Sequence, residues 1–231
     1  MAGSGEKTAL IAGASRGLGL GLAEELLKRG WRVIATERGA SKLAALAETH
    51  PAKLEIERLD TTKPDEIAAL AKRLAGRRLD LLFVNAGVAG PPSERIGAVS
   101  TGEFARILVT NTLSPLRIIE ALADRVPAGG VIGAMSSELG SIGRVASPGW
   151  EVYRASKAGL NILLAAFAAR DPDDARSYVA MAPGWVRTDM GGPHARLDVA
   201  TSMRGVADVL EARAGKRGIA YLNHKGETLP W

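Results

Sequence analysis

Residues 8–19 read TALIAGASRGLG, a short apolar run that breaks into three glycines with the spacing Gly-x-x-x-Gly-x-Gly. The run Thr8–Ala12 is typical of a buried strand, and the apolar spacing after Gly19 predicts a helix that ends at Gly30. A second apolar run follows at once, as a parallel strand would after its crossover helix. The chain therefore begins with a strand, a tight glycine loop, a helix and another strand.

Strand-like and helix-like segments alternate along the rest of the chain. The predicted strands after the first are 31–36, 54–59, 79–84, 131–135, 177–181 and 218–222. The predicted helices are 18–30, 41–49, 64–75, 101–124, 153–169 and 198–214. This alternation predicts one α/β domain over residues 1–231, a three-layer, doubly wound Rossmann fold with a seven-stranded, mainly parallel sheet and helices on both faces. Ligands of such folds bind at the carboxyl ends of the strands.

Composition excludes several classes of protein. The 231 residues include no cysteine, which rules out disulfides and cysteine-ligated metals, and we expect no metal site. The net charge is +5, but the basic residues are scattered and aromatics make up only 4%, so we do not expect nucleic-acid binding. The longest apolar stretch, 162–169, is too short to span a bilayer, and the polar N-terminus lacks a secretion signal. We expect a cytoplasmic protein without membrane contact.

The glycine loop is a candidate phosphate site. Glycines let the backbone approach a ligand closely, and the helix behind them presents free N–H groups and a positive dipole to a pyrophosphate. A structural turn would also use glycines, but their place after the first strand favours dinucleotide binding. The loop residues expected to contact the cofactor are Gly13, Ser15, Arg16, Gly17, Leu18 and Gly19.

The residues that would select between NAD and NADP point in different directions. Glu37 lies about twenty residues past the loop, where a carboxylate binds the ribose of NAD, but Arg38 and Arg16 suit the phosphate of NADP unless they only face solvent. A carboxylate would repel that phosphate, so the sequence weakly favours NAD. Asp60, which precedes Thr61 at the end of the third strand, either accepts a hydrogen bond from the adenine amino group or caps a helix.

Tyr153 and Lys157 form a candidate catalytic pair. A spacing of four places the phenol and the ammonium on one helix face, where the cation is expected to lower the tyrosine pKa and make Tyr153 a general acid/base. Such a pair also arises by chance. Ser137 follows a predicted strand at the same sheet edge, where its hydroxyl would hold a carbonyl oxygen.

Taken together, these motifs resemble the short-chain dehydrogenase/reductase superfamily along essentially the whole chain. The segments after Ser137, Tyr153 and Pro183 and the terminal Leu-Pro-Trp are similar to its C-factor and sniffer-type carbonyl reductase branch. The matching motifs, in order, are Gly13-x-x-x-Gly17-x-Gly19, Asn85-Ala86-Gly87, Asn111, Ser137, Tyr153-x-x-x-Lys157 and Pro183-Gly184.

The resemblance implies roles for further residues. Asn111 would hold a water that links Lys157 to solvent, and Lys157 would also bind the nicotinamide ribose. Asn85, Ala86 and Gly87 would line the adenosine side. The residues implied to lie at the nicotinamide and pyrophosphate are Pro183, Gly184, Val186 and Thr188.

The chain departs from the family pattern in several places. Ala12 stands where a threonine usually supports the glycine loop, and Val84 replaces an asparagine. Ser137 and Tyr153 are 16 residues apart, which implies a longer loop, 143–150, beside the substrate.

The segment that would cover the substrate is short. Only residues 191–197 separate Met190 from a predicted helix cap at Asp198, so we expect a short lid near 190–198 and an open, shallow site. Trp150, Trp185 and Met190 would be its apolar walls, unless they are ordinary core residues.

We therefore expect an NAD(P)-dependent oxidoreductase that interconverts an alcohol and a carbonyl. The alternative is a dinucleotide-binding signalling protein of the C-factor type with incidental catalysis. A homodimer or homotetramer is expected as readily as a monomer.

Overall fold

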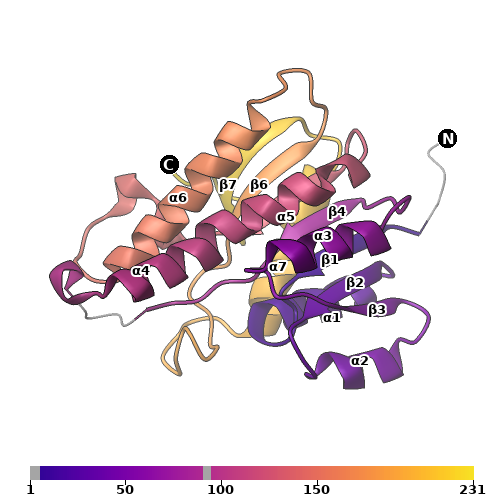
Figure 1. Ribbon diagram of the computed structural model, residues 1–231, viewed down its shortest axis with the longest axis horizontal. Helices are drawn as coiled ribbons and strands as arrows, with labels where there is room; N and C mark the ends of the chain where they lie inside the picture. The colour runs from indigo at the N-terminus through magenta and orange to yellow at the C-terminus, as the bar shows by residue number, and fades with distance from the viewer. Residues whose placement is uncertain (1–5, 91–94) are drawn as a thin grey trace.

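The computed structural model describes residues 6–90 and 95–231, which form a single sheet of seven parallel strands between two layers of helices (Figure 1). The strand order is β3-β2-β1-β4-β5-β6-β7, and all six pairings are parallel. The predicted doubly wound fold is confirmed. The strands are β1 (Thr8–Ala12), β2 (Arg32–Glu37), β3 (Leu54–Arg58), β4 (Leu81–Val84), β5 (Val131–Met135), β6 (Ser177–Ala182) and β7 (Gly218–Asn223).

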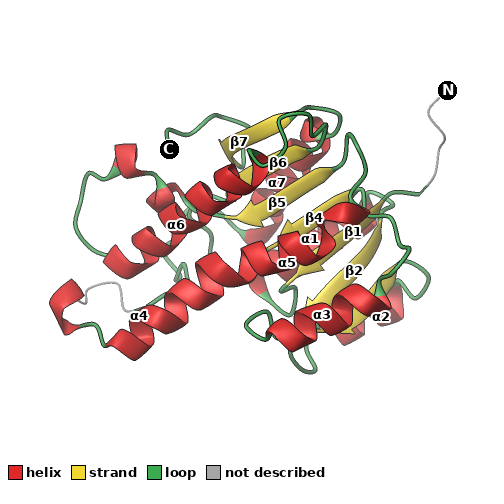
Figure 2. Cartoon of the chain, turned by 45° about the horizontal axis from the view of Figure 1, so that its top comes forward, coloured by secondary structure: helices red, strands yellow, loops and turns green. Residues whose placement is uncertain are grey.

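Helices cover both faces of the sheet (Figure 2), and each face has its own apolar core. The helices α1 (Gly17–Lys28), α2 (Leu43–Thr49) and α7 (Val199–Arg213) supply buried side chains to one core. The helices α3 (Pro64–Arg73), α5 (Ser114–Leu122) and α6 (Glu151–Ala168) supply the other. Because β4 and β5 are buried along their whole length, their sequences are almost continuously apolar, as expected for strands covered on both faces.

The predicted helix 101–124 is the one element whose form is wrong. It is divided into α4 (Thr101–Leu108), a π-helical turn (Val109–Leu113), α5 and a short 3₁₀ turn. Pro115 lies in the first turn of α5 and has no N–H to donate, which interrupts the regular ladder there. Apolar periodicity does not reveal such a turn, and Asn111 lies inside it.

The outer surfaces of α4 and α6 expose apolar side chains. Phe104 and Ile162 are examples, and Ile162 is 65% exposed. Oligomerisation through these helices stays a prediction. No helix in the described part of the chain is long and apolar enough to cross a bilayer.

The order of the strands reverses between β1 and β4, and the glycine loop lies at this point. Gly13 has a φ of +88° and packs on Ala86, while the Asn85 Nδ2 donates to the Gly13 carbonyl at 2.8 Å. Thr36 on β2 accepts the Gly13 N–H through its hydroxyl at 3.0 Å, and so supports the loop where Ala12 offers no hydroxyl. A crevice at such a reversal is where open parallel sheets bind ligands.

Substitution of Gly19 tests how closely the glycine loop approaches the end of β4. A Cβ at Gly19 would lie 2.2 Å from the Gly13 carbonyl oxygen and 2.6 Å from the Asn85 Nδ2, so the backbone must shift. We expect Gly19→Ala to lower the free energy of unfolding by about 1–3 kcal/mol, measured by urea denaturation.

Gly102 provides the matched control, because nothing lies within 4 Å of its Cβ position in α4. Gly102→Ala should raise stability by up to about 1 kcal/mol, since alanine favours a helix over glycine. Equal stability changes for the two variants would contradict the close packing at Gly19.

Candidate active site

Four of the predicted site residues converge at the carboxyl edge of the sheet. Ser137 follows β5 and opens a 3₁₀ turn, with its Oγ accepting the Leu139 N–H at 3.2 Å. Tyr153 and Lys157 lie one turn apart near the start of α6, and the Lys157 Nζ is 5.7 Å from the centre of the Tyr153 ring. Asn111 contacts α6 from the π-helical turn.

Lys157 is a buried cation. Its Nζ donates to the Met135 carbonyl at 2.8 Å, and burial lowers the pKa of Lys157 to about 8. An ammonium has three donors, so N–H groups beyond the one that Met135 accepts are available for a ligand. Gly87 lies beside this group, and a Cβ there would be 3.4 Å from both the Lys157 Nζ and the Asn111 Oδ1.

The expected direction of the Tyr153 pKa shift is wrong. Burial raises the pKa of Tyr153 to about 12, and a hydrogen bond with the Ser137 side chain opposes this shift only in part. Desolvation disfavours the charged phenolate, and in this geometry the Lys157 ammonium is directed to Met135 and does not overcome that penalty. Tyr153 is therefore a protonated phenol at neutral pH.

Asn111 binds protein groups through both ends of its side chain. Its Oδ1 accepts the Val88 N–H at 2.8 Å, and its Nδ2 donates to the Val88 carbonyl at 2.7 Å and to the Ser156 hydroxyl at 3.0 Å. Ser156 in turn donates to the Tyr153 carbonyl at 2.7 Å. Asn111 thus ties the segment after β4 to the catalytic end of α6, while its implied water link stays a prediction.

The residues at the start of α1 fit a pyrophosphate. Arg16 occupies the N-cap position without a side-chain cap, and the first turn of α1 holds no acidic residue, so its N–H groups face no side-chain acceptor. Gly17 has a φ of +56°, and a Cβ there would be 3.8 Å from the Thr188 methyl group. Arg16 also pairs with Asp189, so the loop and the segment after β6 lie side by side. We call the region between them, where the sequence predicts the cofactor, the groove.

Other residues predicted around this groove have varied surroundings. Ser15 is partly buried in the loop, whereas Leu18 packs against the core below α1. The Asn85 Oδ1 is buried and has no hydrogen-bond partner within the described residues. Val186 is buried and pairs with Leu197 in an isolated bridge.

Gly184 follows Pro183 directly after β6. Its φ is +81°, and a Cβ there would be 3.1 Å from the His224 ring. A larger residue therefore does not fit at this end of the groove.

Glu37 and Asp60 are the two acidic residues predicted to contact the adenosine part of the cofactor. Glu37 accepts a hydrogen bond from the Ser41 hydroxyl, and Arg38 beside it is exposed. Burial alone would raise the pKa of Asp60, but hydrogen bonds from Thr62 and the charge of Arg38 outweigh it, so the pKa is lowered. The Asp60 Oδ1 accepts hydrogen bonds from the Thr62 N–H at 2.9 Å and the Thr62 hydroxyl at 2.7 Å, and Thr61 between them is buried. The N-cap of α3 is Lys63, without a side-chain cap, so the cap interpretation of Asp60 is wrong, and its contact with adenine stays a prediction.

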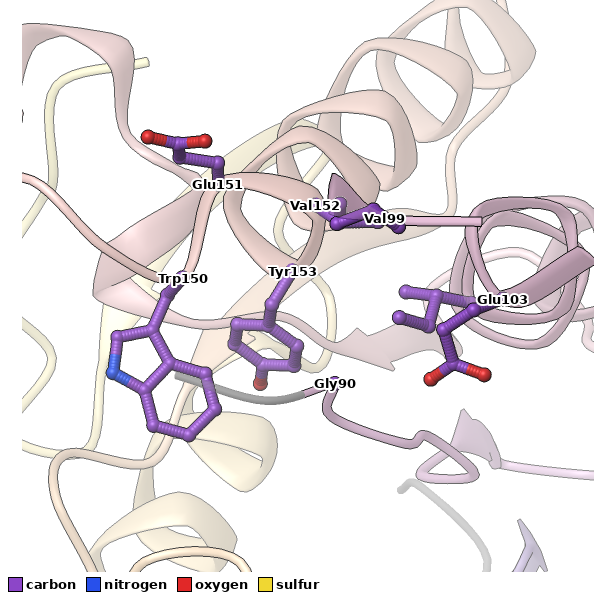
Figure 3. Close-up of a pocket in the computed structure, with 8 residues that line it drawn as sticks. Gly90, Val99, Glu103, Trp150, Glu151, Val152 and Tyr153 are labelled. Carbon is purple, nitrogen blue, oxygen red and sulfur yellow. The ribbon is translucent and has the colours of Figure 1, made fainter. Parts of the chain in front are cut away.

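A hollow lies beside Tyr153, where the sequence predicts the substrate. Figure 3 shows the Trp150 and Tyr153 rings side by side, with Glu151 pointing away, and the ring centres are 5.9 Å apart in an edge-to-face arrangement. Trp150 has a φ of +59°, a left-handed conformation that a bulky residue rarely adopts, and Gly149 before it is also left-handed. The lining residues are Gly90, Val99, Glu103, Ile107, Trp150, Glu151, Val152 and Tyr153.

Sequence reasoning missed the part of this hollow that comes from α4. Glu103 lines it and is held by Arg106, which donates to both carboxylate oxygens at 2.6–2.7 Å. No motif marks Glu103 or Val99. The available signal is their position after β4, because the topology places that segment at the carboxyl edge.

Trp185 and Met190 lie on the segment after β6. They are 54% and 44% exposed, so the core interpretation is wrong for both. The Trp185 Nε1 donates to the Gly191 carbonyl at 2.8 Å, and the Arg187 N–H donates to the Leu197 carbonyl at 2.8 Å. These bonds fold the short segment back on itself.

Residues 7–196 match the family model described as short chain dehydrogenase. The chain belongs to the short-chain dehydrogenase family. The chain is 51% identical to a short-chain dehydrogenase/reductase from Burkholderia multivorans with bound NADP; the two align over 98% of this chain and 100% of that chain, with a TM-score of 0.96.

Two further relatives match the chain over most of their length. The carbonyl reductase Sniffer of D. melanogaster is 31% identical over 98% of this chain and 100% of its own, with a TM-score of 0.88. C-signal of Myxococcus xanthus is 31% identical over 165 residues, which cover 71% of this chain and 99% of C-signal. The predicted resemblance to the C-factor and sniffer-type branch is confirmed.

The buried position of Lys157 makes its titration distinctive. We expect its ammonium to lose its proton near pH 8, because burial disfavours the charged form, whereas solvent-exposed lysines titrate near 10.4. NMR of the protein with ¹³C-labelled lysine measures the pKa of Lys157, and the resonance that disappears in Lys157→Met is that of Lys157. Titration of that resonance above pH 10 would show that the ammonium is solvated.

Proposed function

We propose that this protein is an NADP-dependent oxidoreductase that reduces a carbonyl to an alcohol. The observation that carries the proposal is the protonated Tyr153 phenol beside the Ser137 hydroxyl and the buried Lys157 cation, at the end of an open hollow. Sniffer, which is similar over its whole length, is a carbonyl reductase.

The chain's own residues supply the proton and the orientation. A nicotinamide dinucleotide in the groove supplies the hydride. Tyr153 donates its phenolic proton to the carbonyl oxygen, and the Ser137 hydroxyl holds that oxygen in place. The nearby Lys157 ammonium then offsets part of the cost of the tyrosinate that remains, because their attraction is weakly screened where water is excluded around Lys157. A raised Tyr153 pKa favours this direction, since the acid is in its protonated form at neutral pH.

The surroundings of Glu37 support NADP over NAD. The sequence weakly favours NAD because a free carboxylate would repel a phosphate. The Ser41 hydroxyl engages one oxygen of Glu37 without neutralising the carboxylate, and the exposed Arg38 next to it supplies a cation for the phosphate. Arg16 is also exposed at the mouth of the groove, where its ion pair with Asp189 is weak enough to exchange for a phosphate. The Burkholderia relative contains NADP.

The exposed apolar side chains and the short segment after β6 support bulky substrates and modest selectivity. Trp150, Trp185 and Met190 offer apolar surface, and residues 191–197 are too few for a helical lid. Discrimination of about 10⁴ or more between similar carbonyls requires enclosed polar contacts. We therefore assign the substrate to the class of exposed carbonyls with an apolar or aromatic body, in a single-domain protein with a short lid near 190–198.

The similarity to C-signal supports a second candidate, a dinucleotide-binding signalling protein. Tight cofactor binding without turnover across a broad panel of carbonyls and alcohols would favour it.

Tyr153→Phe tests the proton donor. The variant keeps the ring and loses the proton, so we expect carbonyl reduction to fall at least about a hundredfold while NADPH affinity stays within about twofold. Stopped-flow loss of NADPH absorbance and fluorescence titration measure the two quantities.

Tyr178→Phe is the matched control, because Tyr178 is buried on β6 and its hydroxyl bonds to Asp174. It should keep wild-type turnover. Wild-type turnover by Tyr153→Phe would rule out the assigned acid.

Arg38→Ala tests the cofactor. NADPH should bind the wild type at least about tenfold more tightly than NADH, and Arg38→Ala should remove much of that preference by losing a charge-assisted contact with the phosphate. Arg217→Ala, at an exposed site before β7, should leave both affinities unchanged. Tighter binding of NADH than of NADPH by the wild type would reverse the assignment.

A further inference from the structure

The chain folds back after β7 and runs beside it. Leu222 forms an antiparallel bridge with Thr228, and the Leu229 N–H donates to the Tyr221 carbonyl at 2.9 Å. We call residues 229–231 the return segment. It lies at the carboxyl edge of the sheet, where Ser137 also lies.

The return segment contacts the loop that follows Ser137. The Ser141 hydroxyl donates to the Pro230 carbonyl at 2.6 Å, and the Gly143 N–H donates to the Trp231 carbonyl at 3.3 Å. The Trp231 ring packs on the Tyr221 ring, with centres 5.3 Å apart and an angle of 31° between the planes. Two segments far apart in the sequence are thereby joined beside the proposed catalytic serine.

Tyr221 makes the contact nearest to the chemistry. Its ring is 1% exposed, and its hydroxyl donates to the Ser137 carbonyl oxygen. That oxygen also accepts the Gly140 N–H at 2.9 Å, a local bond that forms the 3₁₀ turn but does not fix the turn to the sheet. The Tyr221 hydroxyl fixes this peptide group to β7.

We propose that Tyr221 is a positioning residue for the reaction: it orients the Ser137 hydroxyl by holding the Ser137 carbonyl, and the return segment braces Tyr221 through Trp231. The inference rests on the proposed function, in which Ser137 holds the substrate oxygen. A hydroxyl that must align with a reacting oxygen loses rate when its backbone moves by a fraction of an ångström. Tyr221 acts through Ser137 and touches no substrate.

The competing explanation is that Tyr221 only fills the core. Tyr178 separates the two explanations, because it lies on the adjacent strand, faces the same core and is 2% exposed. In the β6–β7 pairing Tyr221 lies opposite Ala180, two residues along from Tyr178. The Tyr178 hydroxyl, however, bonds to Asp174 before β6, at the other end of the strand from Ser137. Loss of a buried hydroxyl alone would affect both variants equally.

The test compares Tyr221→Phe with Tyr178→Phe in the full chain, using NADPH and a carbonyl that the wild type reduces. For Tyr221→Phe we expect kcat to fall about tenfold, because Ser137 loses its alignment, with NADPH affinity unchanged. Tyr178→Phe should keep wild-type kcat. In a Ser137→Ala background Tyr221→Phe should cause no further loss, since two residues that act through one contact are not additive. Wild-type kcat in Tyr221→Phe, or a further loss of the same size in the Ser137→Ala background, would overturn the proposal.

Hydrogen exchange measures the positioning without any substrate. Amide exchange of the peptide containing residues 137–144 should quicken about threefold or more in Tyr221→Phe and stay unchanged in Tyr178→Phe. Equal exchange in both variants would overturn the role of Tyr221. If the wild type reduces no carbonyl, the proposed function fails, and the exchange result alone decides whether Tyr221 holds the Ser137 turn.

Discussion

The close approach of the glycine loop to the end of β4 is the constraint on which the site depends. Gly13 lies against Ala86, and Gly19 fills the space between the Gly13 carbonyl and the Asn85 amide, so neither position has room for a side chain. This contact brings α1 up to the point where the strand order reverses and leaves its first N–H groups open. The region predicted to bind a dinucleotide therefore results from the way the neighbouring strands β1 and β4 end.

The second requirement is a dry environment at the same edge. Burial moves the pKa of Lys157 down and the pKa of Tyr153 up, so that at neutral pH the site holds a cation beside a protonated phenol. Both shifts have the same cause, the loss of water around the charged form. Asn111 and Tyr221 hold the backbone around this pair from two sides, through Val88 and Ser137. The proposed chemistry thus depends on main-chain contacts as much as on the side chains assigned to catalysis.

Much of this architecture can be predicted from the sequence because its signals are local. Apolar runs, glycines and caps predicted every strand and all but one helix to within two residues at each end. The spacing of Tyr153 and Lys157 on one helix face is equally local. The π-helical turn around Asn111 depends on Pro115 and on packing against α6, which periodicity does not report. The Tyr153 pKa depends on burial by segments distant in the sequence.

The features that escaped prediction are long-range contacts. The Ser41 hydroxyl donates a hydrogen bond to Glu37, and α4 places Glu103 in the hollow beside Tyr153. Strand β7 places the Tyr221 hydroxyl against the Ser137 carbonyl. Each pairing joins residues whose neighbourhood is set by the tertiary fold. A sequence motif indicates the residues predicted to take part in the reaction, whereas the tertiary fold determines which other residues contact and position them.

The most direct test of the proposed carbonyl reduction is to trace deuterium from the cofactor to the product. The protein is incubated with NADPH that carries deuterium at the transferable position of the nicotinamide and with a panel of aromatic and aliphatic carbonyls, and the products are examined by mass spectrometry and NMR. Hydride transfer to the carbonyl should give an alcohol with one deuterium on the former carbonyl carbon. An alcohol without deuterium, or no alcohol from any carbonyl while the cofactor is bound, would contradict it.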